Sequence, residues 1–85
     1  MYYVYVLRSE TTGSFYIGFS ENPLQRLDTH NTGGNISTKG RRPWKLIYQE
    51  GYLDKRDVLG REKFLKSGSG RSYLRRQLRH YLETE

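Results

Sequence analysis

The feature that most constrains the fold is a pair of aromatic and β-branched segments near the start of the chain. Residues 2–8 and 14–20 are rich in tyrosine, valine and phenylalanine, which favour strands. Residues 9–13 between them are polar and end in glycine, which is typical of a turn. The sequence therefore predicts a β-hairpin, in which we expect Tyr5 to pair with Tyr16.

The two faces of this hairpin differ in character, because side chains alternate between the faces of a strand. The apolar face, which we expect to be core, carries Val4, Val6, Phe15, Ile17 and Phe19. The other face is aromatic and polar, and it carries Tyr3, Tyr5, Leu7, Tyr16 and Gly18. Glycine allows close approach to its backbone, so we expect an open position among the tyrosines.

The next segment predicts a helix that begins with Asn22 as N-cap and ends before Gly33. Leu24 and Leu27 are expected to form its inner edge. Residues 31–42 are polar and contain glycine, which is typical of a mobile loop.

Residues 44–53 alternate well enough to predict a third strand, and Asp54 then caps a second helix. The Ser-Gly-Ser-Gly segment 67–70 is expected to break that helix. A last helix follows, with apolar residues on one side: Leu74, Leu78, Tyr81 and Leu82. A length of 85 residues indicates a single domain, 1–85.

Charge is distributed unevenly along the chain. Residues 1–38 contain two basic and three acidic side chains, whereas residues 39–85 contain thirteen basic and six acidic ones. With a pI of about 9.8, this asymmetry favours a nucleic-acid partner over a basic surface that is merely solvated. The candidate contacts are Lys39, Arg41, Arg42 and the helical stripe Arg71, Arg75 and Arg79.

Composition excludes several other classes. The chain has no cysteine, so it has neither disulfides nor thiolate metal ligands. No apolar run approaches the roughly 18 residues that span a bilayer, and no signal peptide opens the chain. We expect a soluble cytoplasmic protein that does not bind membranes.

Three polar residues outside the hairpin are candidates for chemistry. Arg26 and His30 are four residues apart on one helix face, and a guanidinium suits a phosphoryl group. Glu62 shares a helix face with Val58, Leu59 and Leu65, where a carboxylate is costly unless it is paired or bound to a metal. The sequence leaves open whether Glu62 pairs with Arg26 or binds Mg²⁺.

The order of these motifs resembles the GIY-YIG nuclease superfamily over most of the chain, and its small single-domain branch in particular. Residues 3–5 (Tyr-Val-Tyr) stand where that family has Gly-Ile-Tyr, and residues 16–18 (Tyr-Ile-Gly) match the second motif fully. Arg26, His30 and Glu62 follow at the expected spacing. The first motif lacks its glycine, and no asparagine follows Asn35, although many relatives have one after the glutamate; Gln77 is a possible substitute.

The resemblance implies an α+β fold with a three-stranded antiparallel sheet flanked by helices, in the order ββαβαα. It also implies metal-dependent hydrolysis of a DNA phosphodiester. In the family pattern Tyr5 helps to deprotonate the attacking water, Tyr16 orients water or phosphate, and Arg26 stabilises the transition state. His30 assists proton transfer, and Glu62 holds one Mg²⁺ or Mn²⁺ ion.

Two functions from different classes follow. The first is a structure-dependent or weakly sequence-specific endonuclease with a role in DNA repair or processing, with or without a protein partner that selects the substrate. The second is a nucleic-acid-binding module that kept the scaffold and has little or no catalysis. The nuclease needs the tyrosines, Arg26 and Glu62 to converge, whereas the binding module needs only the basic surface.

Overall fold

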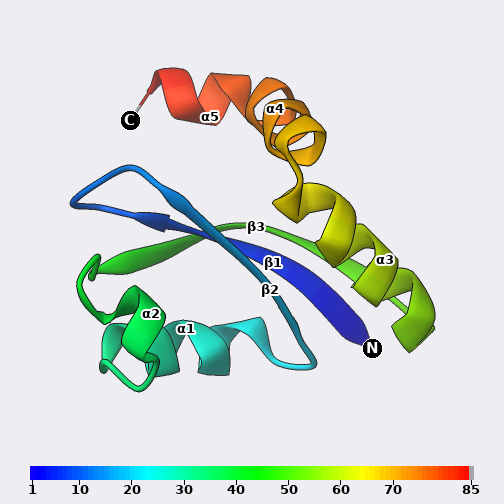
Figure 1. The fold of residues 1–85 in the computed structure, drawn as a ribbon, viewed down its shortest axis with the longest axis horizontal. Coiled ribbons are helices and arrows are strands. Elements are labelled where there is room, and N and C mark those ends of the chain that lie inside the picture. The colour runs from blue at the N-terminus through cyan, green and yellow to red at the C-terminus, as the bar shows by residue number, and fades with distance from the viewer. Residues whose placement is uncertain (85) are drawn as a thin grey trace.

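The computed structural model describes residues 1–84, which form a three-stranded antiparallel sheet with helices on both faces (Figure 1). The strands are β1 (Tyr2–Ser9), β2 (Phe15–Ser20) and β3 (Trp44–Tyr52), and β1 is central. The helices are α1 (Pro23–Asn31), α2 (Ile36–Lys39), α3 (Lys55–Lys66), α4 (Gly68–Gln77) and α5 (Arg79–Glu83). Helices α1 and α2 lie on one side of the sheet, and α3 and α4 lie on the other.

The hairpin register differs from the expected one by two residues. Tyr5 lies opposite Gly18, and Tyr16 lies opposite Leu7, so the expected pairing of Tyr5 with Tyr16 is wrong. The turn sets this register. The Ser9 hydroxyl oxygen accepts hydrogen bonds from the backbone N–H groups of Thr11 and Thr12, and Gly13 has a φ of +74°. A shift of two residues keeps every side chain on its expected face.

The apolar face of the hairpin forms the main core, as the alternation predicts. Its buried members from β1, β2, α3 and α4 are Val4, Val6, Phe15, Ile17, Val58, Leu65 and Leu74. Each large apolar side chain buried in this way stabilises the fold by about 1.5–3 kcal/mol relative to exposure. Helix α4 packs closely on the end of α3 because Gly70 has no side chain; a Cβ there would overlap the Phe64 carbonyl oxygen.

The opposite face carries a smaller core under α1. Tyr5, Leu7 and Trp44 are buried there, and Leu27 of α1 packs against them. Leu24 is 68% exposed, so its expected core position is wrong. It lies on the first turn of α1 and lines an open hollow at the edge of the sheet instead of the packed centre.

The segment expected to be a mobile loop contains the short helix α2. Asn35 caps this helix by accepting the N–H of Ser37, and Thr38 is fully buried within it. The Trp44 indole donates to the Thr38 carbonyl at 3.0 Å. These contacts come from residues distant in sequence, so the polar composition of the segment did not reveal them.

The C-terminal region forms two helices where one was expected after the 67–70 segment. Ser67 ends α3 and caps α4 by accepting the N–H of Gly70, so α4 begins at Gly68. The chain changes direction at Leu78, after which α5 begins. Within residues 1–84, no helix is both long enough and apolar enough to cross a membrane.

Candidate active site

Three ring side chains from β1, β2 and α1 meet on the α1 side of the sheet. The Tyr5 hydroxyl lies 3.3 Å from Nε2 of His30, and both side chains are 1% exposed. The half-buried Tyr16 ring lies 4.6 Å from the His30 ring and 6.3 Å from the Tyr5 ring, measured between centroids. The structure therefore brings both tyrosines and the histidine together.

Gly18 makes room for the Tyr5 ring. The two residues are opposite each other in the hairpin, and a Cβ at Gly18 would lie 2.7 Å from the Tyr5 hydroxyl oxygen. That separation is shorter than any van der Waals contact allows, so the phenol occupies the place of the missing side chain. This packing gives a physical reason for glycine at the end of the Tyr-Ile-Gly motif.

A second hydrogen bond fixes the His30 ring from its other side. Nδ1 of His30 lies 2.8 Å from the Thr38 hydroxyl, which also donates to the Asn35 carbonyl at 3.3 Å. Burial lowers the pKa of His30, and the positive charge of Arg26 lowers it further. Thr38 was missed by sequence reasoning because a threonine in a polar segment carries no signal of burial.

Arg26 lies one helical turn before His30 on α1, and its side chain is exposed. Burial raises the pKa of Tyr5 above 10, while an Arg26 side-chain hydrogen bond to the same phenol acts in the opposite direction. The guanidinium thus influences the Tyr5 hydroxyl and is open to solvent. This position suits contact with a bound anion.

Glu62 lies on α3, on the other side of the sheet from α1. Helix α3 packs on the apolar face, yet the negative charge of Glu62 contributes to the raised pKa of Tyr5. The Glu62 carboxylate is 17% exposed and lies 3.2 Å from Nζ of Lys66. The alternative in which Glu62 pairs with Arg26 is wrong, because its ion-pair partner among the described residues is Lys66; the Mg²⁺ alternative stays a prediction.

The helix stripe expected around Glu62 is only partly buried. Val58 and Leu65 are fully buried, but Leu59 is 39% exposed.

Among residues 1–84, no cluster of three or more acidic or histidine side chains could hold a metal ion by itself. A cation at Glu62 would therefore use one carboxylate and take its remaining oxygen ligands from phosphate and water, as Mg²⁺ often does. Gln77 donates to Tyr48 at 3.2 Å on the apolar face, the face on which α3 also packs, and its role as a substitute for the asparagine stays a prediction.

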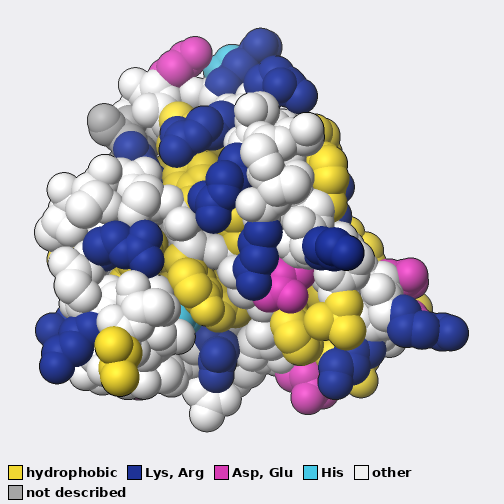
Figure 2. Space-filling model, viewed as in Figure 1, with side chains coloured by type: hydrophobic (Ala, Val, Ile, Leu, Met, Phe, Trp, Pro, Cys, Tyr) yellow, Lys and Arg dark blue, Asp and Glu magenta, His cyan; other side chains and the backbone are white. Residues whose placement is uncertain are grey.

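The expected nucleic-acid contacts fall into two groups. In the first, Arg41 donates to Ser14 and lies over the Trp44 ring, and Arg42 donates to the Lys39 carbonyl. The second group does not form one helical stripe, because Arg79 lies on α5, beyond the break at Leu78. All of its members are exposed: Arg71, Arg75 and Arg79. Figure 2 shows Lys and Arg side chains in a band over the middle of the molecule, extending from the α4–α5 end.

Comparison with known proteins places the chain among related sequences. Residues 1–76 match the protein family described as "GIY-YIG catalytic domain". A UPF0213 protein of Streptococcus pneumoniae serotype 4 is 42% identical over 65 residues, which cover 75% of this chain and 65% of that protein. UPF0213 protein SH2523 of Staphylococcus haemolyticus is 37% identical over 75 residues, which cover 87% and 90%.

A solved structure supports the same relationship. The solution NMR structure of the UPF0213 protein BH0048 from Bacillus halodurans has a TM-score of 0.53 and 29% identity. The match covers 87% of this chain and 82% of that one. The expected α+β fold with a three-stranded antiparallel sheet is thereby confirmed. The chain spans slightly less than two thirds of the pneumococcal relative.

Proposed function

Because this chain belongs to the GIY-YIG family of catalytic domains, we propose that it is a nuclease that hydrolyses phosphodiester bonds of DNA. The observation that carries this proposal is the Tyr5 hydroxyl, which lies 3.3 Å from Nε2 of His30 and whose pKa is lowered by Arg26 against the larger effect of burial. A proton acceptor and a fixed positive charge therefore meet at one hydroxyl. Both assist the hydrolysis of a phosphodiester.

The hydrogen-bond chain sets a direction for proton transfer. The Thr38 hydroxyl has one proton, and when it donates this to Asn35 its oxygen accepts Nδ1–H of His30. Nε2 of His30 then carries a lone pair and accepts the Tyr5 hydroxyl proton. Tyr5 can take a proton from the attacking water as its own proton passes to Nε2. The water oxygen forms the new bond to phosphorus while the bond to the leaving oxygen breaks.

Arg26 and Tyr16 would act on the phosphate itself. The exposed Arg26 fork can bind two phosphate oxygens and offset the charge that develops in the transition state. The Tyr16 hydroxyl belongs to a half-buried ring packed on His30, and it would orient the phosphate or the water. The Tyr16 ring lies 6.3 Å from the Tyr5 ring and Arg26 acts on the pKa of Tyr5, so we expect one bound phosphate to contact Arg26 and Tyr16 together.

Glu62 is the residue that would hold a divalent cation. When bound, Mg²⁺ or Mn²⁺ supplies positive charge that polarises the phosphate and lowers the pKa of a ligated water. The half-buried carboxylate fits this role, because it is a hard oxygen ligand that is still partly open to solvent. Lys66 neutralises the carboxylate in the absence of a cation and would compete with it.

A cleavage assay over duplex, single-stranded, flap and branched DNA, with Mg²⁺, Mn²⁺ or EDTA, tests this function. We expect Glu62→Gln and Arg26→Ala to abolish metal-dependent cleavage while both variants stay folded and bind DNA. Lys66→Ala is the matched control, because it removes the partner of Glu62 and keeps the carboxylate. DNA cleavage by Lys66→Ala should persist and should need a lower metal concentration. Activity on structured DNA would support a role in repair or processing.

A nucleic-acid-binding module without catalysis is the second candidate. The observation that favours it is the Lys66–Glu62 ion pair, which gives the carboxylate a structural role without any metal. This candidate is correct if wild-type protein binds DNA with a strong dependence on salt but cuts none of the four substrates in either metal.

A further inference from the structure

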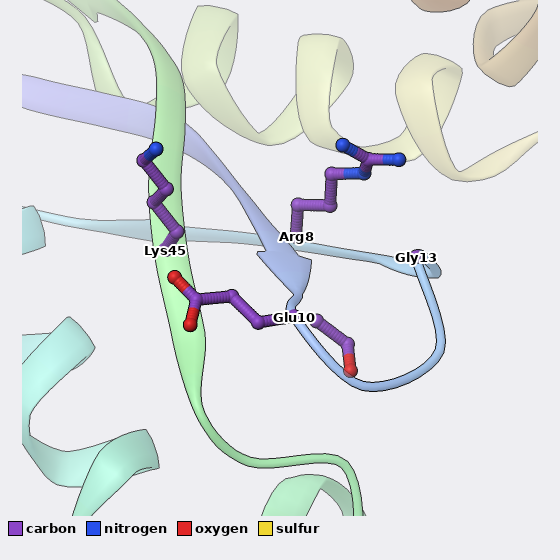
Figure 3. A pocket seen from close by; sticks show the side chains of 5 residues that line it. Arg8, Glu10, Gly13 and Lys45 are labelled. Carbon is purple, nitrogen blue, oxygen red and sulfur yellow. The ribbon is translucent and has the colours of Figure 1, made fainter. Parts of the chain in front are cut away.

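A second cationic hollow lies at the end of the sheet where β1 ends and β3 begins. It has a volume of about 400 Å³ and is lined by Arg8, Ser9, Glu10, Gly13 and Lys45 (Figure 3). None of these five residues belongs to the proposed catalytic cluster. Two of them carry positive charge on neighbouring strands.

The two cations face away from the catalytic cluster. Arg8 is opposite Phe15 on β2 and opposite Lys45 on β3, and Phe15 belongs to the core beneath α3 and α4. Arg8 and Lys45 therefore lie on the α4 face, whereas Tyr5 lies on the α1 face. Figure 3 shows the charged ends of Arg8 and Lys45 on the same side of the strands. Glu10 also lines the hollow, and in this view its carboxylate points away from the charged ends of Arg8 and Lys45.

Helix α4 brings a third positive charge to this corner, and α5 brings an aromatic ring. The Arg75 guanidinium lies 4.5 Å above the Phe15 ring, and Phe15 is the register partner of Arg8. Nζ of Lys45 lies 5.8 Å from the Tyr81 ring of α5. Three elements that are distant in sequence, β1, β3 and α4, thus place two cations in the lining of the hollow and a third nearby.

We propose that this hollow binds a phosphate group of nucleic acid, at a point separate from the catalytic cluster. A guanidinium fork beside an ammonium group suits phosphate oxygens, and the basic α4 surface next to it suits a polyanion more than a single small anion. The source of the phosphate rests on the proposed nuclease function. With one contact on each face of the sheet, the domain would favour bent or branched DNA, because a straight duplex does not reach both faces without being deformed.

Titration of ¹⁵N-labelled protein with inorganic phosphate tests the hollow without any nucleic acid. We expect saturable shifts at the backbone amides of Arg8, Gly13 and Lys45. Lys45→Glu should remove these shifts, and because Lys45 is exposed the variant should fold. Arg56→Glu makes the same change of charge on an exposed arginine at the other end of the sheet, and it should leave the shifts intact.

Binding of DNA in EDTA then identifies the source of the phosphate. For Lys45→Ala we expect the slope of log affinity against log salt to fall by about 0.9, the effect of one lost phosphate contact. The preference for a four-way junction over a linear duplex of the same sequence should also fall.

Absence of phosphate shifts in wild-type protein overturns the site. Phosphate shifts with unchanged DNA binding overturn the nucleic-acid source and assign the hollow to a small phosphate compound. If neither the wild-type protein nor any variant binds DNA, the proposed nuclease function fails. Phosphate shifts would still establish the anion site in that case.

Discussion

The Tyr5 hydroxyl and Nε2 of His30 are 3.3 Å apart, although 25 residues separate them in the chain. Tyr5→Phe removes this hydroxyl and keeps the ring that fills the space above Gly18. We expect cleavage to fall by about 10²–10⁴-fold, the usual contribution of a proton-transfer group, with little change in the melting temperature. Tyr2→Phe is the control, because Tyr2 packs against the opposite core. Equal activity of both variants would exclude Tyr5 from proton transfer.

Thr38 should fix the tautomer of His30. Thr38→Val keeps the shape of this buried side chain but removes the oxygen that accepts Nδ1–H. Long-range ¹H–¹⁵N correlation spectra should show the Nδ1–H tautomer in wild-type protein and a mixture in the variant. We expect cleavage to fall by about tenfold, a fraction of what acid–base catalysis contributes. Thr38→Ser should restore both properties, and a tautomer that does not respond to Thr38→Val would contradict the assignment.

Gly18 should not tolerate even the smallest side chain. A Cβ there would meet the hydroxyl oxygen and Cζ of Tyr5 at 2.7 and 2.8 Å, and the Tyr5 ring is buried and cannot move aside freely. We expect Gly18→Ala to cost about 1–3 kcal/mol of unfolding free energy and to abolish cleavage. Gly60→Ala is the matched control: its Cβ meets nothing within 4 Å. It should stabilise α3 by about 0.5–1 kcal/mol. Urea unfolding of both variants measures the difference.

Stability should depend on the protonation of His30. Its folded-state pKa lies below the usual 6.5, so the unfolded chain binds the proton more tightly. The associated stability is present above pH 6.5 and is lost as the pH falls from there through the lowered pKa. We expect the unfolding free energy to decrease over this range in wild-type protein and much less in His30→Gln. His80→Gln, at an exposed position on α5, should retain the wild-type pH dependence; an identical slope in all three proteins would argue against the assignment.

Glu50 should hold α3 on the sheet. Its carboxylate accepts hydrogen bonds from Tyr48 at 2.6 Å, from Tyr52 at 2.7 Å and from Arg61 of α3 at 2.9 and 3.0 Å. Burial acts to raise the pKa of Glu50, but the hydrogen bonds from Arg61, Tyr48 and Tyr52 lower it overall. Because the Arg61 pair is charged and mostly buried, we expect Glu50→Gln to cost about 2 kcal/mol. Thermal unfolding should show no such loss for Arg56→Ala, which breaks an exposed pair.

Sequence reasoning succeeded where the signals are local. Strand alternation placed Tyr5 and Tyr16 on one face and Val4 on the other, and this assignment survived a register error of two residues. Asn22 and Asp54 cap their helices as expected, because a cap joins groups that are near neighbours in the chain. These features depend on backbone geometry and nearest neighbours alone.

The sequence by itself thus determined the order of the three strands and of helices α1, α3 and α4, and which side chains share each face of the hairpin. It did not reveal the short helices α2 and α5. Only the tertiary structure decided the burial of Thr38, the exposure of Leu24 and the partner of Glu62. Each of these depends on contacts between elements far apart in the chain. Local propensity carries no information about such contacts, because they form only when the helices have packed on the sheet.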